Sequence, residues 1–280
     1  MDVAALIAAS RQLLTPAERR VADVVLSSPQ EVAFGTVADL ARRAGTSGAT
    51  VVRLAAKLGL DGFTALQEEV QAELAHRLRP AAERIREPQP GDVIGRAALT
   101  ELDNVQGTLE GVSRDEFDHV VGLLADPERR VAVLPGEASR GVGLLLADEL
   151  SMLRPGVQLL LGTEVRLAQA VAEVEPGDVV VVIDLRRYER WLLSTVALLG
   201  ERGARIVALS DSALSPLADL AHHTFVVLAE GSGPFDSHVG TLALANALTS
   251  GVAGVLQATA TERLDRIEAV WRATDALADG

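Results

Sequence analysis

The apolar residues of the first 78 positions recur at helical intervals. Leu66, Val70 and Leu74, for example, lie four residues apart and are separated mostly by polar residues. Such spacing puts apolar side chains on one face of an α-helix, where they can pack into a core. We therefore expect residues 1–78 to form an all-α domain.

A connector follows this helical part. Residues 79–92, RPAAERIREPQPGD, contain three of the eleven prolines of the chain together with many charged residues. Prolines and charges at such density favour a linker over a packed element. The sequence predicts a linker over residues 79–91 and a second domain over residues 92–280, which opens with amphipathic helical segments up to about Ala125.

The pattern changes again from Arg130 onward. The apolar residues now come in short continuous runs, which are typical of strands covered on both faces in a parallel sheet. The runs are RVAVL (130–134), VQLLL (157–161), VVVVI (179–183), RIVAL (205–209) and TFVVL (224–228). Helical spacing between them, over 142–150, 165–174 and 191–199, predicts crossover helices. The second domain is thus expected to be an α/β three-layer sandwich with a five-stranded parallel sheet.

The composition of the chain indicates the cellular compartment in which it works. The chain of 280 residues has no cysteine, which excludes disulfides and thiolate metal sites and is typical of the cytoplasm. The opening MDVAALIAASRQLL lacks the basic start of a signal peptide. The least polar stretch, 239–256, is interrupted by Thr241 and Asn246, so we expect a helix buried within a domain there rather than a membrane span.

The charge of the chain is distributed unevenly. A net charge of −13 argues at first against nucleic acid, because phosphate contacts need cations. Residues 1–80, however, carry nine basic and nine acidic side chains. Residues 40–60 carry no acidic side chain but four basic ones, Arg42, Arg43, Arg53 and Lys57. The N-terminal domain therefore has a local basic face on an acidic protein.

This basic segment has the layout of two short helices joined by a turn. In TVADLARRAGTSGATVVRLAAKLG, residues 36–59, Thr36 and Ser47 can each cap a helix and Gly45 supplies the turn. Small or branched apolar residues between them suit two helices that cross closely, which is helix-turn-helix geometry. A plain helix hairpin with solvated arginines is the structural alternative.

A helix-turn-helix unit assigns a role to each polar residue of this segment. The N-terminal residues of its second helix meet base edges, while cations and the helix N-terminus hold phosphates. The base-reading candidates are Gly48, Ala49, Thr50 and Arg53. The candidates for contacts to the DNA backbone are Arg42, Arg43, Ser47 and Lys57.

The surrounding sequence resembles a known family. Residues 14–74 open with LTPAER, continue through DLARRAGTSGATVVR and close with KLGLDGFTALQ. In order and spacing these pieces resemble the N-terminal domain of RpiR-type transcriptional regulators. Members of that family carry a C-terminal SIS (sugar isomerase) domain, and residues 130–260 resemble one. The resemblance implies binding to a double-stranded DNA operator and a phosphosugar site in the second domain.

In SIS domains a glycine-containing loop after the first strand and a Ser-rich loop after a later strand bind phosphate. Backbone N–H groups and short hydroxyls supply the donors, often over a helix N-terminus. The first loop matches in PGEASRG, at Gly136 and Ser139. A third loop, LSDSALSPLADLA, offers Ser210 and Ser212 at the carboxyl edge of the sheet, where open α/β sheets bind ligands. Simple helix capping by Ser212 or Ser215 is the alternative role for the hydroxyls of this loop.

The second loop departs from the family pattern. Where sugar-phosphate SIS proteins have Ser-x-Ser-Gly-x-Thr, this chain has DLRRYE, residues 184–189. Asp184 would repel an anion, whereas Arg186 and Arg187 are forked donors suited to phosphate or carboxylate. With Tyr188 they form an RRY run that resembles a subgroup of the same regulators. Three interpretations stay open: another anionic ligand held partly by the arginines, an ordinary phosphosugar, or a domain that only dimerises, with the arginines in salt bridges.

No catalytic residue, cofactor or metal site is predicted. A sugar-phosphate isomerase would need an acid–base pair and an intact phosphate cradle. The consecutive residues 236–238, Asp-Ser-His, cannot converge as a hydrolase triad, and the adjacent His222 and His223 diverge, so a metal site is not expected. Trp191 and Trp271 are interpreted as packing residues.

The sequence as a whole predicts a ligand-responsive DNA-binding regulator. A homodimer or homotetramer would present paired recognition helices to a palindromic operator, and a small anionic effector such as a phosphosugar would bind in the SIS-like domain. The alternatives are a constitutive DNA-binding dimer and a SIS-type isomerase.

Overall fold

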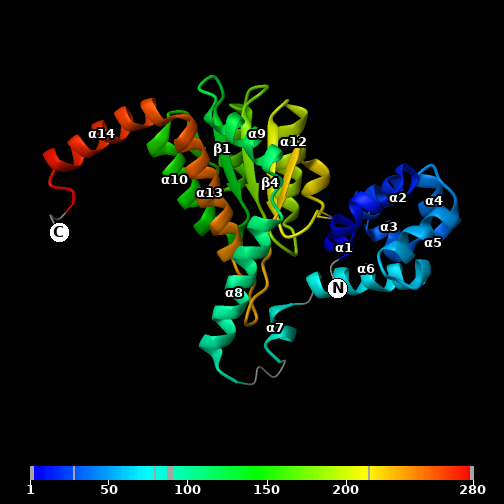
Figure 1. Cartoon of the computed structure of the whole chain (residues 1–280). Helices are drawn as coiled ribbons and strands as arrows, with labels where there is room; N and C mark the ends of the chain where they lie inside the picture. The colour runs from blue at the N-terminus through cyan, green and yellow to red at the C-terminus, as the bar shows by residue number, and fades with distance from the viewer. Residues whose placement is uncertain (1–2, 28, 79, 87–90, 214, 278–280) are drawn as a thin grey trace. The chain divides into compact units, whose positions relative to one another are not determined.

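The computed structural model describes residues 3–27, 29–78, 80–86, 91–213 and 215–277 (Figure 1). It divides into two compact units. One comprises residues 1–87 together with 212–219, and the other comprises residues 88–211 and 220–280. The division near residue 87 falls within the segment predicted as a linker.

The first unit is all-α, which confirms the fold class predicted for it. Its main core is formed by buried apolar residues that recur at helical spacing, among them Val21, Leu54 and Leu66. The helices are α1 (Val3–Ser10), a 3-10 turn (Arg11–Leu13), α2 (Pro16–Ser27), α3 (Pro29–Phe34), α4 (Val37–Arg43), α5 (Gly48–Lys57) and α6 (Gly62–Leu78). A short helix, α7 (Ala81–Arg84), follows.

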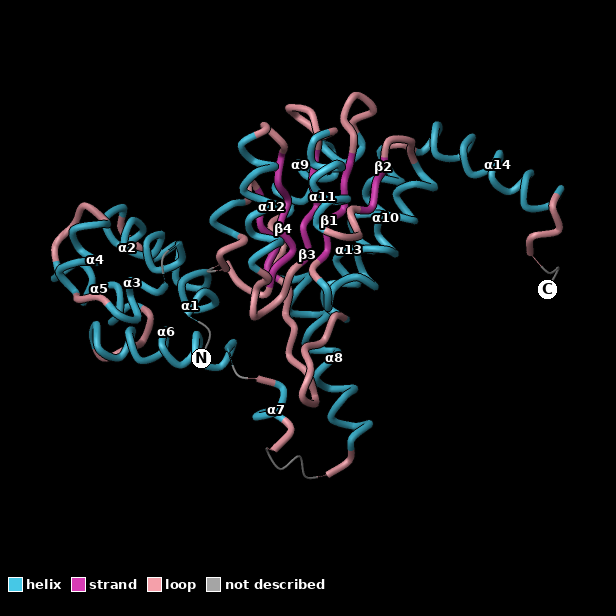
Figure 2. Tube along the Cα trace, turned by 180° about the vertical axis from the view of Figure 1, so that it is seen from behind, coloured by secondary structure: helices cyan, strands magenta, loops and turns pink. Residues whose placement is uncertain are grey.

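The second unit contains the predicted five-stranded parallel sheet (Figure 2). The strand order is β2-β1-β3-β4-β5. Each predicted run forms a strand, although β2 and β5 each end two residues earlier than expected. The strands are β1 (Val131–Pro135), β2 (Val157–Leu159), β3 (Val179–Ile183), β4 (Arg205–Ser210) and β5 (His223–Val226).

Helices cover both faces of the sheet, as the continuous apolar runs predict. On one face, alternate strand residues such as Val133, Val181 and Val207 share a core with α9, α10 and α13. On the other face α12 contacts β4 and α11. The helices are α8 (Val93–Glu110), α9 (Arg114–Ala125), α10 (Arg140–Leu153), α11 (Glu164–Ala172), α12 (Arg190–Glu201), α13 (Val239–Val255) and α14 (Gln257–Ala273).

The register brings three loop positions together at the carboxyl edge of the sheet. Pro135 of β1 pairs with Ile183 of β3, which pairs in turn with Leu209 of β4. The next residue on each strand is therefore Gly136, Asp184 or Ser210, and these three positions lie side by side. Because side chains alternate along a strand, Asp184 and Ser210 face the side of the sheet opposite to Ile183 and Leu209.

The least polar stretch forms a helix of the core. In α13 the side chains of Leu244, Leu248 and Val252 are buried in the second unit. No single helix in the described ranges is long and apolar enough to cross a bilayer, and α13 and α14 reach that composition only as a pair bent by 103°.

Candidate functional sites

The helix-turn-helix segment is ordered by short polar contacts. Thr36 accepts the backbone N–H of Asp39, and the Asp39 carboxylate accepts the backbone N–H of Thr36 at 3.1 Å, so a capping box starts α4. Gly45 has a φ of 59°, which lets the chain turn between α4 and α5 at no steric cost. Ser47 holds the predicted N-cap position of α5, but its hydroxyl bonds to the Thr50 hydroxyl at 3.1 Å instead of a backbone N–H.

The outer face of α5 carries some of the base-reading candidates. Ala49 and Arg53 are exposed, and the Arg53 side chain is 61% exposed. Thr50 instead lies on the buried face, at 4% exposure, and its hydroxyl accepts a hydrogen bond of 3.0 Å from Arg53 Nη2. Thr50 therefore orients Arg53, while Gly48 at the start of the helix is partly exposed.

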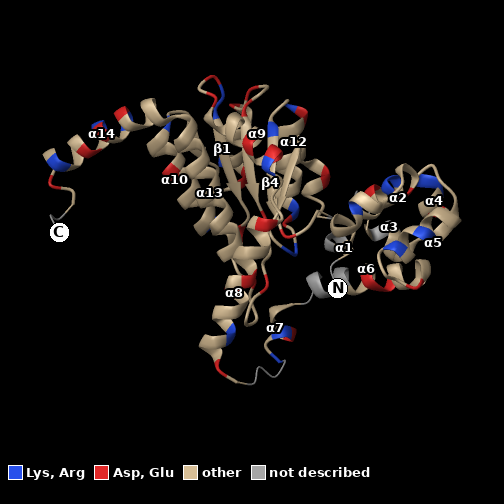
Figure 3. Ribbon diagram, in the orientation of Figure 1, with Lys and Arg blue, Asp and Glu red and all other residues tan. Residues whose placement is uncertain are grey.

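The basic residues of this segment lie on α4 and α5 (Figure 3). Arg42 and Arg43 end α4 and are exposed, and Arg42 pairs with Asp39. Lys57, at the end of α5, is bound within the unit. Its Nζ donates to the Leu13 carbonyl at 2.8 Å and to the carboxylate of Glu18 at 2.7 Å.

Two residues before the helix-turn-helix segment hold it in place, and the sequence analysis missed both. The Glu18 carboxylate accepts the backbone N–H of Thr15 at 2.8 Å, and the hydrogen bond from Lys57 lowers the pKa of Glu18 to about 2. Arg20 donates to the carbonyls of Ala44 and Gly45 at 3.2 and 3.4 Å. The Thr15–Glu18 spacing is a capping-box signal visible in the sequence, whereas nothing local indicates the role of Arg20.

The loop after β1 approaches the loop after β3 closely. Gly136 donates its N–H to the carbonyl of Ile183 at 2.8 Å, and a Cβ at Gly136 would lie 2.6 Å from Asp184 Oδ1, so a larger residue would have to displace the Asp184 side chain. Ser139, three residues further, is buried, and its hydroxyl has no hydrogen-bond partner among the described residues. The first candidate loop thus holds a buried hydroxyl at Ser139 and lies close to Asp184 at Gly136.

Asp184 is a buried carboxylate at this edge. It is 4% exposed, and burial raises its pKa to about 7. The backbone N–H of Glu189, which donates to Oδ2 at 3.1 Å, partly offsets this effect, and the negative charges of Glu189 and Asp211 add to it. The group therefore changes its charge near neutral pH.

Arg186 and Tyr188 face carboxylates of neighbouring loops. The Arg186 guanidinium, 11% exposed, lies 2.9 Å from Glu230 and 3.0 Å from Asp236. Asp211 Oδ1 accepts the backbone N–H of Arg186 at 3.0 Å and the hydroxyl of Tyr188 at 2.7 Å. Ion pairs within the domain therefore engage Arg186.

Arg187 and the two serines complete the predicted set. Arg187 is exposed. Ser210, the last residue of β4, is fully buried, and its hydroxyl is unpartnered within the described part of the chain. Ser212 is buried two residues beyond. Loops after β1, β3 and β4 hence bring Gly136, Asp184 and Ser210 to one edge.

Glu189 is a site residue that sequence reasoning missed. Its Oε1 accepts the backbone N–H of Glu137 at 2.6 Å, and its Oε2 accepts the indole N–H of Trp191. The loop after β1 lies 52 residues away from Glu189 in the chain, so no local pattern could reveal the contact.

The histidines and the run 236–238 engage separate partners. His222 accepts the backbone N–H of Ile206 at 3.1 Å, His223 contacts Glu116, and Ser237 donates to Glu101. No group of three or more His, Asp or Glu side chains suited to a metal ion occurs within the described ranges.

Comparisons with known proteins match both parts of the chain. Residues 1–77 match the model of the helix-turn-helix domain of the rpiR family, and residues 157–251 match the SIS domain. The uncharacterized HTH-type transcriptional regulator YbbH of Bacillus subtilis is 26% identical over 278 residues, which cover 95% of each chain.

Two solved structures have the same architecture. The sugar isomerase domain of an RpiR transcription factor from Sphaerobacter thermophilus is 25% identical, with a TM-score of 0.59, and covers 62% of this chain and 97% of its own. The Vibrio vulnificus NanR protein complexed with ManNAc-6P is 22% identical, with a TM-score of 0.57, and covers 99% of this chain and 100% of its own.

These findings define the class first: a helix-turn-helix DNA-binding domain followed by an α/β domain of the sugar isomerase type. The chain belongs to the RpiR-type transcriptional regulators, as the motifs in residues 14–74 and 130–260 indicated.

Proposed function

We propose that this regulator binds a palindromic operator as a homodimer in the cytoplasm and responds to a sugar phosphate or another small anion. The observation that carries the DNA-binding part is the exposed outer face of α5, with Ala49 and Arg53 beside the exposed Arg42 and Arg43 of α4. Residues 40–60 contain no carboxylate that would repel DNA phosphates.

The contacts divide by the exposure of each side chain. Gly48, Ala49 and Arg53 meet base edges, and Arg42, Arg43 and Ser47 hold phosphates. Thr50 and Lys57, also predicted as contacts, support DNA binding without touching DNA. Thr50 orients Arg53, and Lys57 binds α5 to Glu18 of α2.

A comparison of Arg53→Ala with Arg43→Ala in a DNA titration tests these assignments. If Arg53 reads a base, its loss relaxes sequence preference by about 1–3 kcal/mol at one position. Loss of a phosphate contact at Arg43 instead weakens binding to all sequences and lowers the salt dependence. Equal, sequence-independent losses in both variants would contradict a base-reading role for Arg53.

The effector site lies at the carboxyl ends of β1, β3 and β4. Its support is the buried hydroxyls of Ser139 and Ser210, which have no hydrogen-bond partner among the described residues, because short hydroxyls are among the usual donors to phosphate. NanR, a protein of the same fold, has a solved structure in complex with ManNAc-6P. Arg187 is the exposed cation of this edge, while Arg186 and Tyr188 brace the loop through Asp211.

The ion pairs of Arg186 favour a second candidate function, a constitutive DNA-binding dimer without an effector. A guanidinium already held by Glu230 and Asp236 has little left to offer a ligand, and this fits a domain that dimerises without an effector. A thermal-shift screen with sugar phosphates, amino sugars and small organic acids distinguishes the two. Stabilisation that Arg187→Ala abolishes supports the effector site, and no stabilisation by any compound supports the constitutive dimer.

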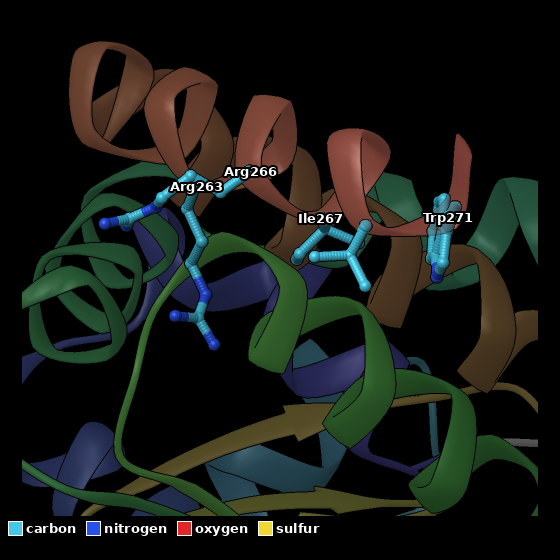
Figure 4. Close-up of a pocket in the computed structure, with 5 residues that line it drawn as sticks. Arg263, Arg266, Ile267 and Trp271 are labelled. Atoms are coloured by element: carbon cyan, nitrogen blue, oxygen red, sulfur yellow. The ribbon is translucent and has the colours of Figure 1, made fainter. Parts of the chain in front are cut away.

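The homodimer is supported by helix α14. Ala260, Leu264, Ile267 and Trp271 follow one another at intervals of three or four residues, and this apolar row starts in the core, where Ala260 is buried. It continues to Ile267 and Trp271, which project from one side of the helix beside an open hollow (Figure 4). A second copy of the chain can cover the row, as in two-stranded helical pairs.

Light scattering after gel filtration tests this interface. Ile267→Glu and Trp271→Glu should convert a dimer to monomer, because each puts a charge into the apolar row. Val165→Glu, at an exposed apolar position of α11, should leave the dimer intact. A dimer that survives both α14 variants would exclude this row as the interface.

Regulation, not catalysis, is the proposed role of the second unit. An isomerase needs an acid–base pair aimed at a sugar carbon, and the nearest carboxylates, Asp184 and Glu189, bind backbone and indole N–H groups of the domain.

A further inference from the structure

Glu189 belongs to the loop after β3, and its carboxylate contacts the loop after β1. It accepts the backbone N–H of Glu137 at 2.6 Å and the indole N–H of Trp191. Glu189 stands at the N-cap position of α12, yet its side chain makes no capping hydrogen bond to that helix. One oxygen of this carboxylate thus accepts a side-chain donor of α12, and the other accepts a backbone donor of another loop.

The place that this carboxylate occupies suits an anion. Residues 136–139 lead directly into α10, whose N-terminus carries a partial positive charge. Ser139 is the N-cap residue of α10, and its hydroxyl is buried without a partner in the part of the chain that the structure describes. A backbone N–H, a hydroxyl and a helix N-terminus are the groups with which proteins hold phosphates.

Two anions cannot share this position. A phosphate that took the N–H of Glu137 would come into direct contact with the Glu189 carboxylate. Asp184 adds to the repulsion when it is ionised, because its Oδ1 lies close to Gly136 of the same loop. Like charges in direct contact repel each other. The carboxylate of Glu189 has to leave before another anion can enter.

The loop that carries Glu189 has strained backbone. Arg186 and Arg187 have φ angles of 37° and 43°, in the left-handed region that residues with a Cβ rarely adopt. Asp211 holds this conformation through the backbone N–H of Arg186 and the hydroxyl of Tyr188. Rearrangement of residues 185–188 can relieve this strain and withdraw Glu189 in one movement.

We infer that Glu189 is a built-in competitor of the effector. It keeps free inorganic phosphate out of the loop after β1 and admits only a ligand whose other groups offset the displacement of this carboxylate. The inference rests on the proposed effector site and narrows its ligand to a phosphorylated or carboxylated molecule with further polar groups, such as sugar hydroxyls, beyond the anion.

Calorimetric titration of the full chain with inorganic phosphate tests the inference. Glu189→Gln keeps the shape and one acceptor but removes the charge, and Glu189→Ala removes the side chain. Glu201→Gln, at the exposed opposite end of α12, is the matched control. Both Glu189 variants should bind phosphate about tenfold tighter than the wild type and the control. Adding Ser139→Ala to Glu189→Gln should remove that gain.

Other outcomes of these titrations would contradict the role of Glu189 or the effector site itself. Phosphate affinity that is unchanged or lower in both Glu189 variants overturns the inference, as does a gain that survives Ser139→Ala. A sugar phosphate that stabilises the wild type and Glu189→Gln equally leaves the effector site standing and removes the role of Glu189. If no sugar phosphate stabilises either protein while duplex DNA still binds, the effector site itself is wrong and the inference is wrong with it.

Discussion

Lys57 of α5 and Glu18 of α2 form an ion pair in which Nζ lies 2.7 Å from Oε2. The Glu18 side chain is only 3% exposed, and its carboxylate also accepts the backbone N–H of Thr15. One carboxylate therefore couples the first turn of α2 to the last turn of the recognition helix. The orientation of α5 therefore depends on a residue of α2, outside the helix-turn-helix segment.

Replacement of Lys57 by methionine should destabilise the first unit by about 1–3 kcal/mol. It removes the hydrogen-bonded cation of the buried Glu18 carboxylate and leaves only Arg53, whose Nε lies 3.9 Å from Oε1. Native-state hydrogen exchange of α5 amides in the full chain measures this free energy of opening. Arg42→Met removes an equal charge from an exposed position and should change it by less than about 0.5 kcal/mol. Equal effects of the two variants would contradict a structural role for the ion pair.

The same pair makes the first unit sensitive to acid. The pKa of Glu18 is lowered from 4.5 to about 2 by the hydrogen bond from Lys57. A carboxylate with a lowered folded-state pKa stabilises the fold above its unfolded pKa and loses that contribution as the pH falls. Stability from Glu18 should thus be complete above about pH 4.5 and disappear toward pH 2. Denaturant unfolding of the wild type should show a steeper loss over this window than Glu18→Gln.

Arg20 should affect DNA binding without touching DNA. Its guanidinium holds the carbonyls of Ala44 and Gly45 at the turn before the recognition helix. Loss of these hydrogen bonds in Arg20→Met should cost about 1 kcal/mol, which corresponds to roughly fivefold in operator affinity if it falls on the orientation of α5. Arg19→Met, the same charge change at the exposed neighbouring position, is the control in the same titration. Equal losses of operator affinity in the two variants would mean that Arg20 acts only through its charge and not through its hydrogen bonds.

Asp184 should make the second unit less stable as the pH rises toward 8. Burial raises its pKa from 3.8 to about 7, so the protonated form is favoured in the folded state. Its stabilising contribution is complete below about pH 4 and is lost as the pH rises through about 7. The melting temperature of the wild type should therefore fall between pH 5 and pH 8. In Asp184→Asn this fall should be smaller, because the side chain of the variant does not ionise. Asp148→Asn, at an exposed position of α10, should leave the pH profile unchanged.

Gly136→Ala should damage the effector edge, because the added Cβ would meet Asp184 Oδ1 at 2.6 Å. Overpacking of this kind typically costs about 1–3 kcal/mol, measurable by chemical denaturation. Gly141→Ala, in the first turn of α10 with nothing within 4 Å of the new Cβ, should be neutral or stabilising, because alanine favours helix. A neutral Gly136→Ala would show that the loop moves freely away from Asp184.

The helices and strands of this protein could be predicted because their signals lie in residues that are close together in the sequence. Continuous apolar runs such as VVVVI at 179–183 form strands since both faces of the sheet are covered, and the i, i+4 spacing of Leu66 and Val70 forms a helix since one face is covered. The capping box at Thr36 and the left-handed Gly45 are local signals as well. Motif order and spacing then sufficed to recognise the family.

The partners of the charged side chains could not be predicted in this way. Lys57 meets Glu18 across 39 residues, Arg186 meets Glu230 across 44, and Glu189 meets the backbone of Glu137 across 52. Residue types alone marked Lys57 and Arg186 as cations for DNA and effector. A long side chain, however, binds whichever opposite charge the packing of distant elements brings within 3 Å. Periodicity depends on neighbours in the chain, while charge pairing depends on neighbours in space, and only the folded chain supplies those.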